Sequence, residues 1–509
     1  MASNLSRRDF LKVVSLAAGG LALSGLKPKS RFFKSLHGEK PPNILIIVFD
    51  AMSARNLSLY GYPRNTTPNF ERFAQRATVY HAHRSSGNFT VPGVASLLTG
   101  VYPWTHRAIN IGGLIQRRIA DRNIFRLIGS EYQRLAFSQN LWPNYFFGQF
   151  QGDIETVLPP ESFSTVAQIV GSHLKGDENA AYRAYDDFLL QDGEPPASLV
   201  SGLLARMVQR RAVARAESPE YPRGLPRTGN YPIYFKLNDM FAGLRSTLQQ
   251  LTTPFFAYFH FWSPHAPYKP TSQFEQLFIK DEWRPEPKPD HRLGDQISRV
   301  NLNNRRRNYD EYIANIDAEF GNLLDAMEHD GLLDQSYVIL TADHGESFER
   351  GVEGHITPLL YEPLIHVPMM ISSPGQQARQ DVYTSTSHVD MLPTLMHLSG
   401  REIPDWTEGQ VLPTLGGMDD PNRALFSMEA KANPAFAPLK KATVTMVKGQ
   451  YKMIYYTGLE SNDSFELYDL QNDSEELHDI YPELPVSAEP LREELLEELA
   501  KVNSNYKKD

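Results

Sequence analysis

The sequence predicts an α/β fold in which helices cover both faces of a mainly parallel sheet, followed by a small α+β subdomain. Between residues 43 and about 400, apolar runs of strand length alternate with amphipathic helical segments. The run Asn43-Ile44-Leu45-Ile46-Ile47-Val48-Phe49 is apolar almost throughout, which is typical of a strand buried on both faces. From about Arg423 the pattern changes to short strands and one terminal helix.

The predicted elements follow in chain order. In the first part we expect strands at 43–49, 255–262, 336–341 and 366–371. The helices expected there are 67–77, opened by Thr67-Pro68, 304–329, ending near Gly331, and 389–398, closed by Gly400. In the C-terminal part we expect strands at 442–447, 451–456 and 465–469 and a helix at 490–503.

The length bears on the domain organisation. The chain has 509 residues, more than the roughly 250–300 at which one hydrophobic core stops growing, so a large and a small domain are expected. We assign residues 31–422 to a catalytic domain and 423–509 to the subdomain. The polar range 152–239, with the basic stretch Arg206–Arg215, is expected to be a variable insert of a solvated helix and loops.

Composition excludes several functional classes. Lys and Arg number 51 against 60 Asp and Glu, a net charge of −9, which argues against nucleic acid as a partner. Cysteine is absent, so disulfides, zinc–thiolate sites, iron–sulfur clusters and thiol nucleophiles are excluded. The hydrophobic content of 41% and the charged content of 22% exclude disordered and fibrous proteins.

The first thirty residues are interpreted as an export signal. Ser6-Arg7-Arg8-Asp9-Phe10-Leu11-Lys12 fits the twin-arginine export pattern, and the apolar run Val13 to Leu26 follows it. We therefore expect a twin-arginine signal peptide at 1–30, the export machinery as a partner, and a periplasmic or extracellular protein. An uncleaved leader that anchors the protein is the alternative. Fourteen apolar residues are too few to cross a hydrocarbon core of about 30 Å easily.

Candidate metal ligands stand where two predicted strands end. Asp50 ends the first strand, and Asp343-His344 directly follow the strand at 336–341. The carboxyl ends of such strands border the crevice in which α/β proteins bind ligands. Two carboxylates and an imidazole could hold a divalent cation there. Each residue alone has a structural alternative, since an Asp after a strand often caps a turn or a helix.

Thr90 is the candidate nucleophile. In Gly87-Asn88-Phe89-Thr90-Val91-Pro92 it is predicted to be the N-cap of a short helix that ends at Gly100. The structural alternative is a capped helix without a chemical role. The functional interpretation places the hydroxyl at a helix N-terminus, which favours anions. A threonine hydroxyl is a weak nucleophile at neutral pH and needs a base or a metal to lower its pKa.

A series of further motifs follows along the chain, and together they resemble one family. The motifs are Pro42 to Asp50, Tyr60-Gly61-Tyr62, Thr67-Pro68-Asn69, Leu97-Leu98-Thr99-Gly100-Val101-Tyr102-Pro103, Pro264-His265-Ala266-Pro267-Tyr268, Asp343-His344-Gly345-Glu346, Gly354-His355, Leu360-Tyr361-Glu362, His388-Val389-Asp390 and Glu466-Leu467-Tyr468-Asp469-Leu470. In this order they resemble the sulfatase family of the alkaline-phosphatase superfamily over about residues 42–480. The resemblance implies an alkaline-phosphatase-like sheet sandwiched by helices.

The chain also departs from that family's pattern. Strict sulfatases carry a Cys or Ser, oxidised to formylglycine, where this chain has Thr90, and an Arg where it has Val94. Thr90 cannot become that aldehyde because its β-carbon already carries a methyl group. The family's paired aspartates and Asp-Asn are replaced by Asp50-Ala51 and Asp343-His344. Fewer oxygens and one imidazole favour Mn²⁺, Zn²⁺ or Mg²⁺ over Ca²⁺ as the single divalent metal.

The resemblance implies a role for each site residue. Thr90 attacks the ester in line, and Asp50, Thr90, Asp343 and His344 surround the metal. His265 and His355 contact the anionic oxygens or protonate the leaving oxygen, whereas Glu346 and His388 are expected to be structural supports. Secondary substrate-binding candidates are Asn88, Lys269 and His260.

The leading functional prediction is a metal-dependent hydrolase of phosphate esters or diesters, with a small-molecule, glycan or lipid-headgroup anionic ester as its substrate. Three alternatives remain open: a transferase of a phosphoglycerol or phosphoethanolamine group, a sulfatase that works without formylglycine, and a non-catalytic binding protein. The sequence leaves the leaving group and the oligomeric state open.

Overall fold

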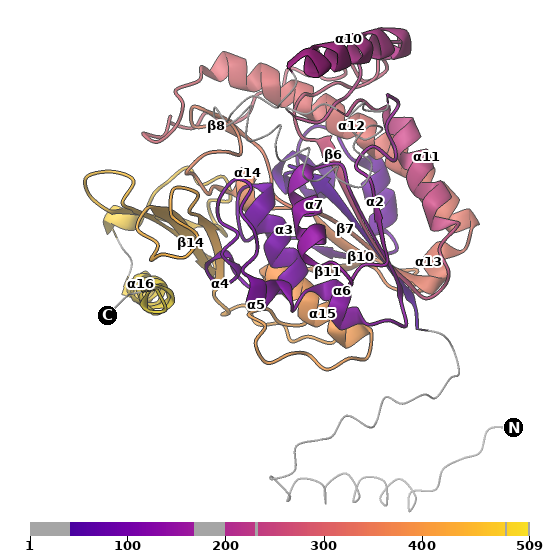
Figure 1. The fold of residues 1–509 in the computed structure, drawn as a ribbon. Helices are drawn as coiled ribbons and strands as arrows, with labels where there is room; N and C mark the ends of the chain where they lie inside the picture. Colours follow the sequence, from indigo (N-terminus) through magenta and orange to yellow (C-terminus); the bar gives the residue numbers. More distant parts are fainter. Residues whose placement is uncertain (1–40, 167–198, 230–232, 484–485, 507–509) are drawn as a thin grey trace, which may run out of the picture. The chain divides into compact units, whose positions relative to one another are not determined.

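The computed structural model describes residues 41–166, 199–229, 233–483 and 486–506, and its centre is an eight-stranded sheet (Figure 1). The order across the sheet is β11 (Gln380–Val382), β2 (Thr78–Tyr80), β10 (Met369–Ser372), β7 (Ser336–Ala342), β1 (Asn43–Asp50), β6 (Phe255–Pro264), β4 (Gln133–Ser138) and β5 (Thr156–Leu158). All neighbouring pairs are parallel except those of β10, which is antiparallel to β7 and β2. The predicted α/β fold with a mainly parallel sheet is confirmed.

Strand β1 shows how the apolar sequence run covers both faces of the sheet. Successive side chains point to opposite faces, so Leu45 and Ile47 enter one core and Ile44 and Ile46 the other. The helices packed on the first core are α2 (Pro68–Ala74), α11 (Leu237–Leu248) and α12 (Arg299–His329). The helices on the second are α3 (Thr90–Thr99), α5 (Arg117–Ala120), α6 (Ile124–Ile128), α7 (Leu141–Gln149) and α15 (Met391–Leu398). Figure 1 shows these two helical layers with the sheet between them.

Several predicted boundaries were wrong. The strand expected at 366–371 is shorter, because α14 (Glu362–Ile365) ends just before it and β10 begins at Met369. Helix α12 begins at Arg299, five residues earlier than 304, because Ser298 caps it by accepting a hydrogen bond from the Asn301 amide. The sequence prediction also missed β2, β4, β5 and β11, which are short or begin with polar residues.

The smaller elements complete the core region. They are β3 (His83–Arg84) paired with β12 (Thr386–Ser387), β8 (Ser347–Glu349) paired with β9 (Val352–Gly354), and the helices α4 (Pro103–His106), α10 (Leu199–Ala216) and α13 (Leu332–Gln335). The predicted insert 152–239 lies partly outside the described residues, and the predicted signal peptide lies wholly outside them.

A C-terminal subdomain is present, as predicted. Its antiparallel sheet has the order β13 (Leu425–Glu429), β14 (Ala442–Lys448), β15 (Tyr451–Thr457) and β16 (Ser464–Asp469). Helix α16 (Glu489–Ser504) packs Leu491, Leu495 and Leu499 against this sheet. The same apolar cluster includes Tyr102 and Trp104 of the main part of the chain. Burial of these side chains from both parts fixes the subdomain beside the α3–α4 region.

A buried ionic network also joins the subdomain to α14 and β3 of the main part of the chain. The Lys452 ammonium on β15 lies 3.1 Å from Glu362 Oε1 and 2.7 Å from Glu476 Oε1, and its side chain is fully buried. Glu362 in turn accepts hydrogen bonds from the Arg84 guanidinium at 3.0 Å through both oxygens. Two buried carboxylates thus share two buried cations.

Replacing Lys452 by methionine is expected to destabilise the fold by about 3–5 kcal/mol, because it leaves buried carboxylates without their cation. The measurement is the shift of the urea unfolding midpoint. The matched control is Lys448→Met on the same hairpin, whose partner Glu494 is a third exposed and whose loss is expected to cost at most about 1 kcal/mol. Equal shifts in the two variants would contradict the role of the network.

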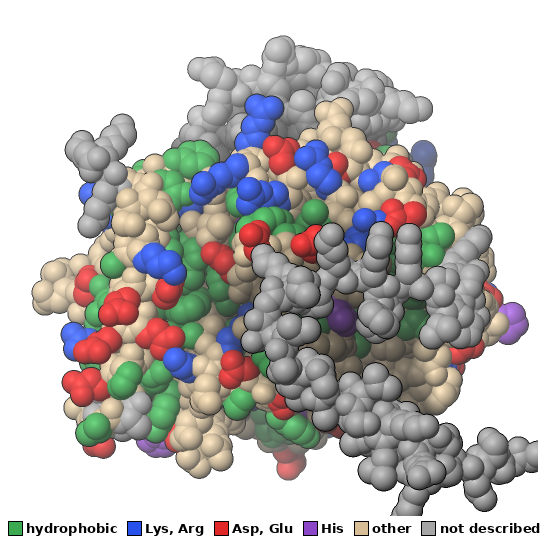
Figure 2. Space-filling view, turned by 90° about the horizontal axis from the view of Figure 1, so that it is seen from below, with side chains coloured by type: hydrophobic (Ala, Val, Ile, Leu, Met, Phe, Trp, Pro, Cys, Tyr) green, Lys and Arg blue, Asp and Glu red, His purple; other side chains and the backbone are tan. Residues whose placement is uncertain are grey.

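The charged side chains on the surface are mixed in sign, as the similar numbers of acidic and basic residues in the sequence lead one to expect. Figure 2 shows acidic and basic side chains interspersed on the face of the molecule drawn there. Among the described residues, no helix is long and apolar enough to cross a bilayer.

Candidate active site

The strand register brings the candidate metal ligands together. Phe49 of β1 pairs with Ala342 of β7, so the next residues, Asp50 and Asp343, leave the sheet side by side. At the same point the pairing of β1 with β6 shifts from Phe49–Phe261 to Asp50–Pro264, an irregularity that ends the regular ladder. Both carboxylates and the His344 imidazole are fully buried. The sheet edge therefore delivers three ligating groups to one place.

Three ligand atoms converge. His344 Nε2 lies 3.5 Å from Asp50 Oδ1 and 3.5 Å from Asp343 Oδ2. One ligand atom from each of the three residues lies within 4.8 Å of the other two. The distances are therefore well inside the limit of about 6 Å beyond which one ion could not be shared by all three groups.

The hydrogen bonds leave those atoms free for a cation. Asp343 Oδ1 accepts from the amides of Ala51 (3.1 Å) and His344 (2.9 Å), whereas its Oδ2 is buried without a partner. Asp50 Oδ2 accepts from Asn140, whereas its Oδ1 is buried without a partner. His344 Nδ1 donates to the Gly345 carbonyl at 2.8 Å, which leaves Nε2 available as a ligand when the imidazole is neutral. Unpaired buried carboxylate oxygens are costly, so this donor set fits a divalent cation.

Thr90 lies directly beside these atoms. Its Oγ1 is 3.4 Å from His344 Nε2 and accepts a hydrogen bond from Asn140 Nδ2 at 3.2 Å. The prediction that Thr90 is the N-cap was wrong: Phe89 is the N-cap residue, and Thr90 opens the helix without a capping hydrogen bond from its side chain. Its hydroxyl is therefore not engaged by the backbone of the helix. Gly93 permits this approach, because a Cβ there would collide with the Asp343 carbonyl oxygen.

Asn140 is a site residue that the sequence analysis missed. Its Oδ1 accepts from the Trp142 amide at 3.0 Å and caps α7, which fixes the orientation of the amide. Its Nδ2 consequently faces Asp50 Oδ2 at 2.6 Å and Thr90 Oγ1 at 3.2 Å. The available signal was the polar cap Asn140 after the short apolar run that forms the end of β4.

Three more histidines surround the cluster. His260 is fully buried, and its Nε2 lies 3.6 Å from both Asp50 Oδ2 and Asp343 Oδ2, so it neighbours the carboxylates themselves. The His355 ring lies 4.2 Å from that of His344 and 4.9 Å from that of His265. Nδ1 of His355 is 3.1 Å from Glu346 Oε1, which leaves the other ring nitrogen for a ligand. The structure thus groups His265 and His355 beside the candidate metal ligands.

Asn88 and Lys269 have other contacts. Asn88 Nδ2 donates to the carbonyls of His355, Thr357 and Leu359, so it holds the loop that carries His355. The Lys269 ammonium donates to the Leu225 carbonyl at 3.1 Å. Within the described part of the chain, neither residue forms a hydrogen bond or ion pair with Asp50, Thr90, Asp343 or His344. Their predicted contact with substrate stays a prediction.

The charges of the cluster shift one another's pKa values. Burial alone would raise the pKa of Asp50, but His265, His260 and His344 hold it well below the usual value. Burial and the nearby Asp50 charge raise the pKa of Asp343. Burial disfavours the charged form of His344, yet Asp343 and Asp50 outweigh it and raise its pKa to about 9. Without a cation, a proton on His344 balances the two facing carboxylates.

A metal ion must therefore displace that proton. The apparent metal affinity is expected to rise about tenfold per pH unit between pH 6 and 8 and to level off above about pH 9. A competition titration with a chelator of known affinity measures it. The stability of the metal-free fold depends on pH in the opposite direction. The raised pKa of His344 stabilises the fold fully below pH 6.5, the ordinary pKa of histidine, and this stabilisation is lost as the pH rises through about 9. A metal affinity independent of pH would contradict this coupling.

Comparison with known proteins places the chain in a family. A family model described as Sulfatase matches residues 42–401, and one described as N-sulphoglucosamine sulphohydrolase, C-terminal matches residues 357–505. The chain belongs to the sulfatase family. Enzymes of this family are ester hydrolases that use a divalent metal, and Asp50, Asp343 and His344 form a candidate site for one. The prediction of a sulfatase-family ester hydrolase is confirmed at this level.

The known relatives of this chain are distant in sequence. Choline-sulfatase of Rhizobium meliloti (strain 1021) is 24% identical over 86% of this chain and 81% of its own length. Human arylsulfatase A is 25% identical over 82% of this chain and 75% of its own. The crystal structure of the phosphonate monoester hydrolase of Agrobacterium radiobacter superposes with a TM-score of 0.63 at 19% identity, covering 92% of this chain and 96% of that one. This last likeness concerns the fold.

Proposed function

We propose that the chain is an exported, metal-dependent hydrolase of singly charged phosphorus esters, namely phosphodiesters or phosphonate monoesters, with Thr90 as the nucleophile. The observation that supports it is the position of Thr90 Oγ1, 3.4 Å from His344 Nε2 and beside two buried carboxylate oxygens that accept no hydrogen bond. The twin-arginine pattern at Ser6 to Lys12 supports export.

The charge of the site favours a singly charged substrate. A divalent cation and the two carboxylates of Asp50 and Asp343 together carry no net charge. Among the described residues, no Lys or Arg forms a hydrogen bond or ion pair with Asp50, Thr90, Asp343 or His344. A phosphate monoester dianion would bring a second charge with no cation to balance it. Phosphodiesters, phosphonate monoesters and sulfate monoesters carry only one.

Each residue of the site has its own role in the proposed reaction. A bound divalent cation would supply the positive charge that lowers the pKa of the Thr90 hydroxyl and offsets charge on the ester oxygens. The Thr90 hydroxyl releases its proton to solvent, and the Asn140 amide, which donates to Thr90 Oγ1, stabilises the oxygen that remains. Thr90 Oγ1 then forms a bond to phosphorus while the bond to the leaving oxygen breaks. His265 or His355 gives the leaving oxygen its proton, and water later cleaves the Thr90 ester and restores the hydroxyl.

A panel of nitrophenyl esters tests the proposal. The purified protein, loaded with Mn²⁺ or Zn²⁺, is expected to hydrolyse bis-nitrophenyl phosphate and nitrophenyl phenylphosphonate with a kcat/KM at least about tenfold above that for nitrophenyl phosphate. Trapping with acid and mass spectrometry of the peptide that contains Thr90 should detect the covalent phosphorus adduct. A preference for the dianionic monoester would overturn the charge argument.

Sulfate ester hydrolysis is the second candidate. It is favoured by the relatives named choline-sulfatase and arylsulfatase A, since sulfate monoesters are also singly charged. Nitrophenyl sulfate in the same panel distinguishes the two. A kcat/KM for the sulfate above that for the phosphorus esters would establish a sulfatase that works without formylglycine.

Asn140 gives a more specific prediction. Asn140→Ser keeps an oxygen that can cap the Trp142 amide but removes the amide donor to Asp50 and Thr90. The loss of such a partner is expected to lower kcat/KM by about 10–100-fold. The melting temperature of the variant should stay near that of the wild type, whereas Asn140→Ala should lower both activity and stability. Unchanged activity in Asn140→Ser would remove Asn140 from the reaction.

A further inference from the structure

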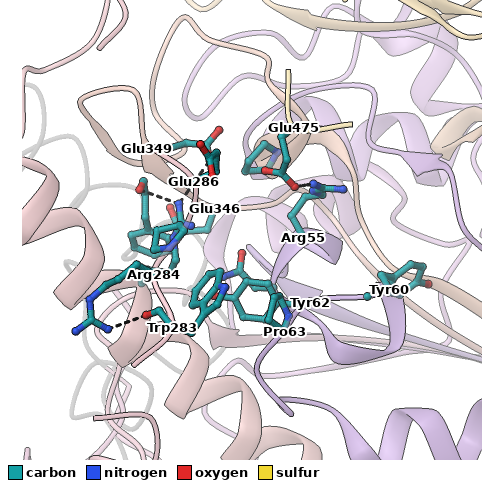
Figure 3. A pocket seen from close by; sticks show the side chains of 16 residues that line it. Arg55, Tyr60, Tyr62, Pro63, Trp283, Arg284, Glu286, Glu346, Glu349 and Glu475 are labelled. Carbon is teal, nitrogen blue, oxygen red and sulfur yellow. Dashed lines mark hydrogen bonds and ion pairs between the residues drawn. The ribbon is translucent and has the colours of Figure 1, made fainter. Parts of the chain in front are cut away.

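A cavity of about 230 Å³ lies between the segment 278–285 and the first turns of α12. Its lining includes none of the residues in the Asp50–Asp343–His344–Thr90 cluster. It borders the larger cavity of about 350 Å³ drawn in Figure 3 and shares Trp283, Arg284, Pro285 and Arg306 with it. We call the smaller one the arginine cavity, because four arginines line it: Arg64, Arg284, Arg306 and Arg307.

Carboxylates outside the cavity balance two of these arginines. Arg64 lies 2.5 Å from Asp281 and 2.7 Å from Asp310. Arg306 donates to the Phe348 carbonyl at 2.9 Å and lies 3.5 Å from Glu349. These two guanidiniums are largely satisfied by the protein itself.

The other two keep unused donors. The Arg284 guanidinium donates to the Trp283 carbonyl at 2.7 Å and forms no ion pair with any residue that the structure describes. Figure 3 shows it directed away from the carboxylates of Glu286 and Glu475. Arg307 is 4.0 Å from Glu311, which is itself closer to Arg223, at 3.1 Å. The described lining contains no Asp or Glu, so the positive charges of Arg284 and Arg307 meet no carboxylate within the cavity itself.

The other walls of the arginine cavity indicate which chemical group would be attached to a bound anion. Phe278, Trp283, Ile279 and Val300 supply apolar surface, and Ile279 and Val300 are 47% and 70% exposed. Trp283 is held in place by edge contact with Tyr62, at 5.1 Å between ring centroids. The amides of Asn303 and Asn304 complete the polar side. A flat or apolar group could pack on Trp283 while its charge meets the guanidiniums.

We propose that the arginine cavity is a second binding site, separate from Thr90, for a small anion that carries a ring, such as a sulfonate, sulfate, phosphate or carboxylate on an aromatic or sugar ring. Guanidinium pairs recognise such groups through paired hydrogen bonds. The cavity volume suits one ring with one anionic group. The inference rests on the cavity alone and does not require the proposed reaction.

Calorimetric titration with benzenesulfonate tests the proposal, because this probe has no ester bond to cleave. The wild type is expected to bind it more tightly than inorganic sulfate and to bind neutral benzyl alcohol no better than sulfate. Arg284→Gln and Arg307→Gln should each lower the affinity for benzenesulfonate at least tenfold. The matched control is Arg117→Gln, an exposed arginine on α5, which should leave it unchanged.

Hydrolysis of a small nitrophenyl ester separates this site from Thr90. Arg284→Gln and Arg307→Gln should keep kcat/KM within about twofold of the wild type while binding of benzenesulfonate is lost. No binding at millimolar concentration, equal binding by both variants and the wild type, or an equal loss in Arg117→Gln would each overturn the proposal. Equal affinity for sulfate and benzenesulfonate would overturn the role of Trp283 and the apolar wall.

Discussion

Replacing Thr90 by alanine is expected to lower kcat/KM by about 10⁴-fold or more, because loss of a covalent nucleophile removes the reaction path and not just one contact. The fold should remain, since the Thr90 hydroxyl caps no helix. Metal binding should also remain, because Asp50, Asp343 and His344 supply the three candidate ligand atoms without Thr90. Steady-state kinetics with the preferred nitrophenyl ester, at saturating metal, measure the effect.

Thr90→Ser is the matched control for this experiment. It keeps a hydroxyl that can accept the hydrogen bond from Asn140 and removes only a methyl group, so most of the activity should remain. Thr90→Val keeps the shape of the side chain and should be as inactive as the alanine variant. Substantial turnover by Thr90→Ala or Thr90→Val would mean that water attacks the ester directly, with Thr90 only as a neighbour.

The second large effect is expected for Asp343→Asn. The change removes the negative charge from an oxygen that is buried and accepts no hydrogen bond, so bound metal should fall from about one ion per chain to a small fraction. Activity should fall by more than the roughly 100-fold that loss of an outer partner of a metal site costs. Metal analysis after gel filtration and kinetics at fixed metal concentration provide the two measurements.

Thermal unfolding distinguishes metal loss from misfolding. At a metal concentration about 100 times Kd, the wild type should gain about 2.7 kcal/mol, and a chelator should remove that gain. Asp343→Asn should show no difference with and without the chelator. In chelator it should be no less stable than the wild type, because one of two facing buried carboxylates has become neutral. A variant that still binds one ion would show that the ion is held elsewhere.

Much of the candidate site could be predicted from the sequence. Asp50 and Asp343 each follow a continuous apolar run, and parallel strands deliver the residues at their carboxyl ends to one edge. The pairing of β1 with β7 was not predictable from those runs, because register depends on contacts between segments almost 300 residues apart. Asn140 was missed for the same reason: its partners Thr90 and Asp50 are 50 and 90 residues away in sequence.

Local patterns also misled in identifiable ways. Thr90 precedes Val91-Pro92 as an N-cap would, yet Phe89 occupies that position, and α3 packs with Gly93 against the Asp343 carbonyl. The run from His366 was expected to be one strand, whereas its first residues turn out of α14 before β10 begins. In both cases tertiary packing overrode a signal of a few residues.

The sequence by itself determined the α/β fold, the strands that carry Asp50 and Asp343-His344, and the absence of thiol chemistry, because hydrophobic periodicity and residue type are local properties of the chain. Only the tertiary structure decided which atoms remain unpaired. Whether Asp343 Oδ2 and Asp50 Oδ1 face a shared space depends on the Ala51 amide and the Asn140 side chain taking up the other oxygens. Those hydrogen bonds form only when distant segments pack together, and they make three buried residues a candidate metal site.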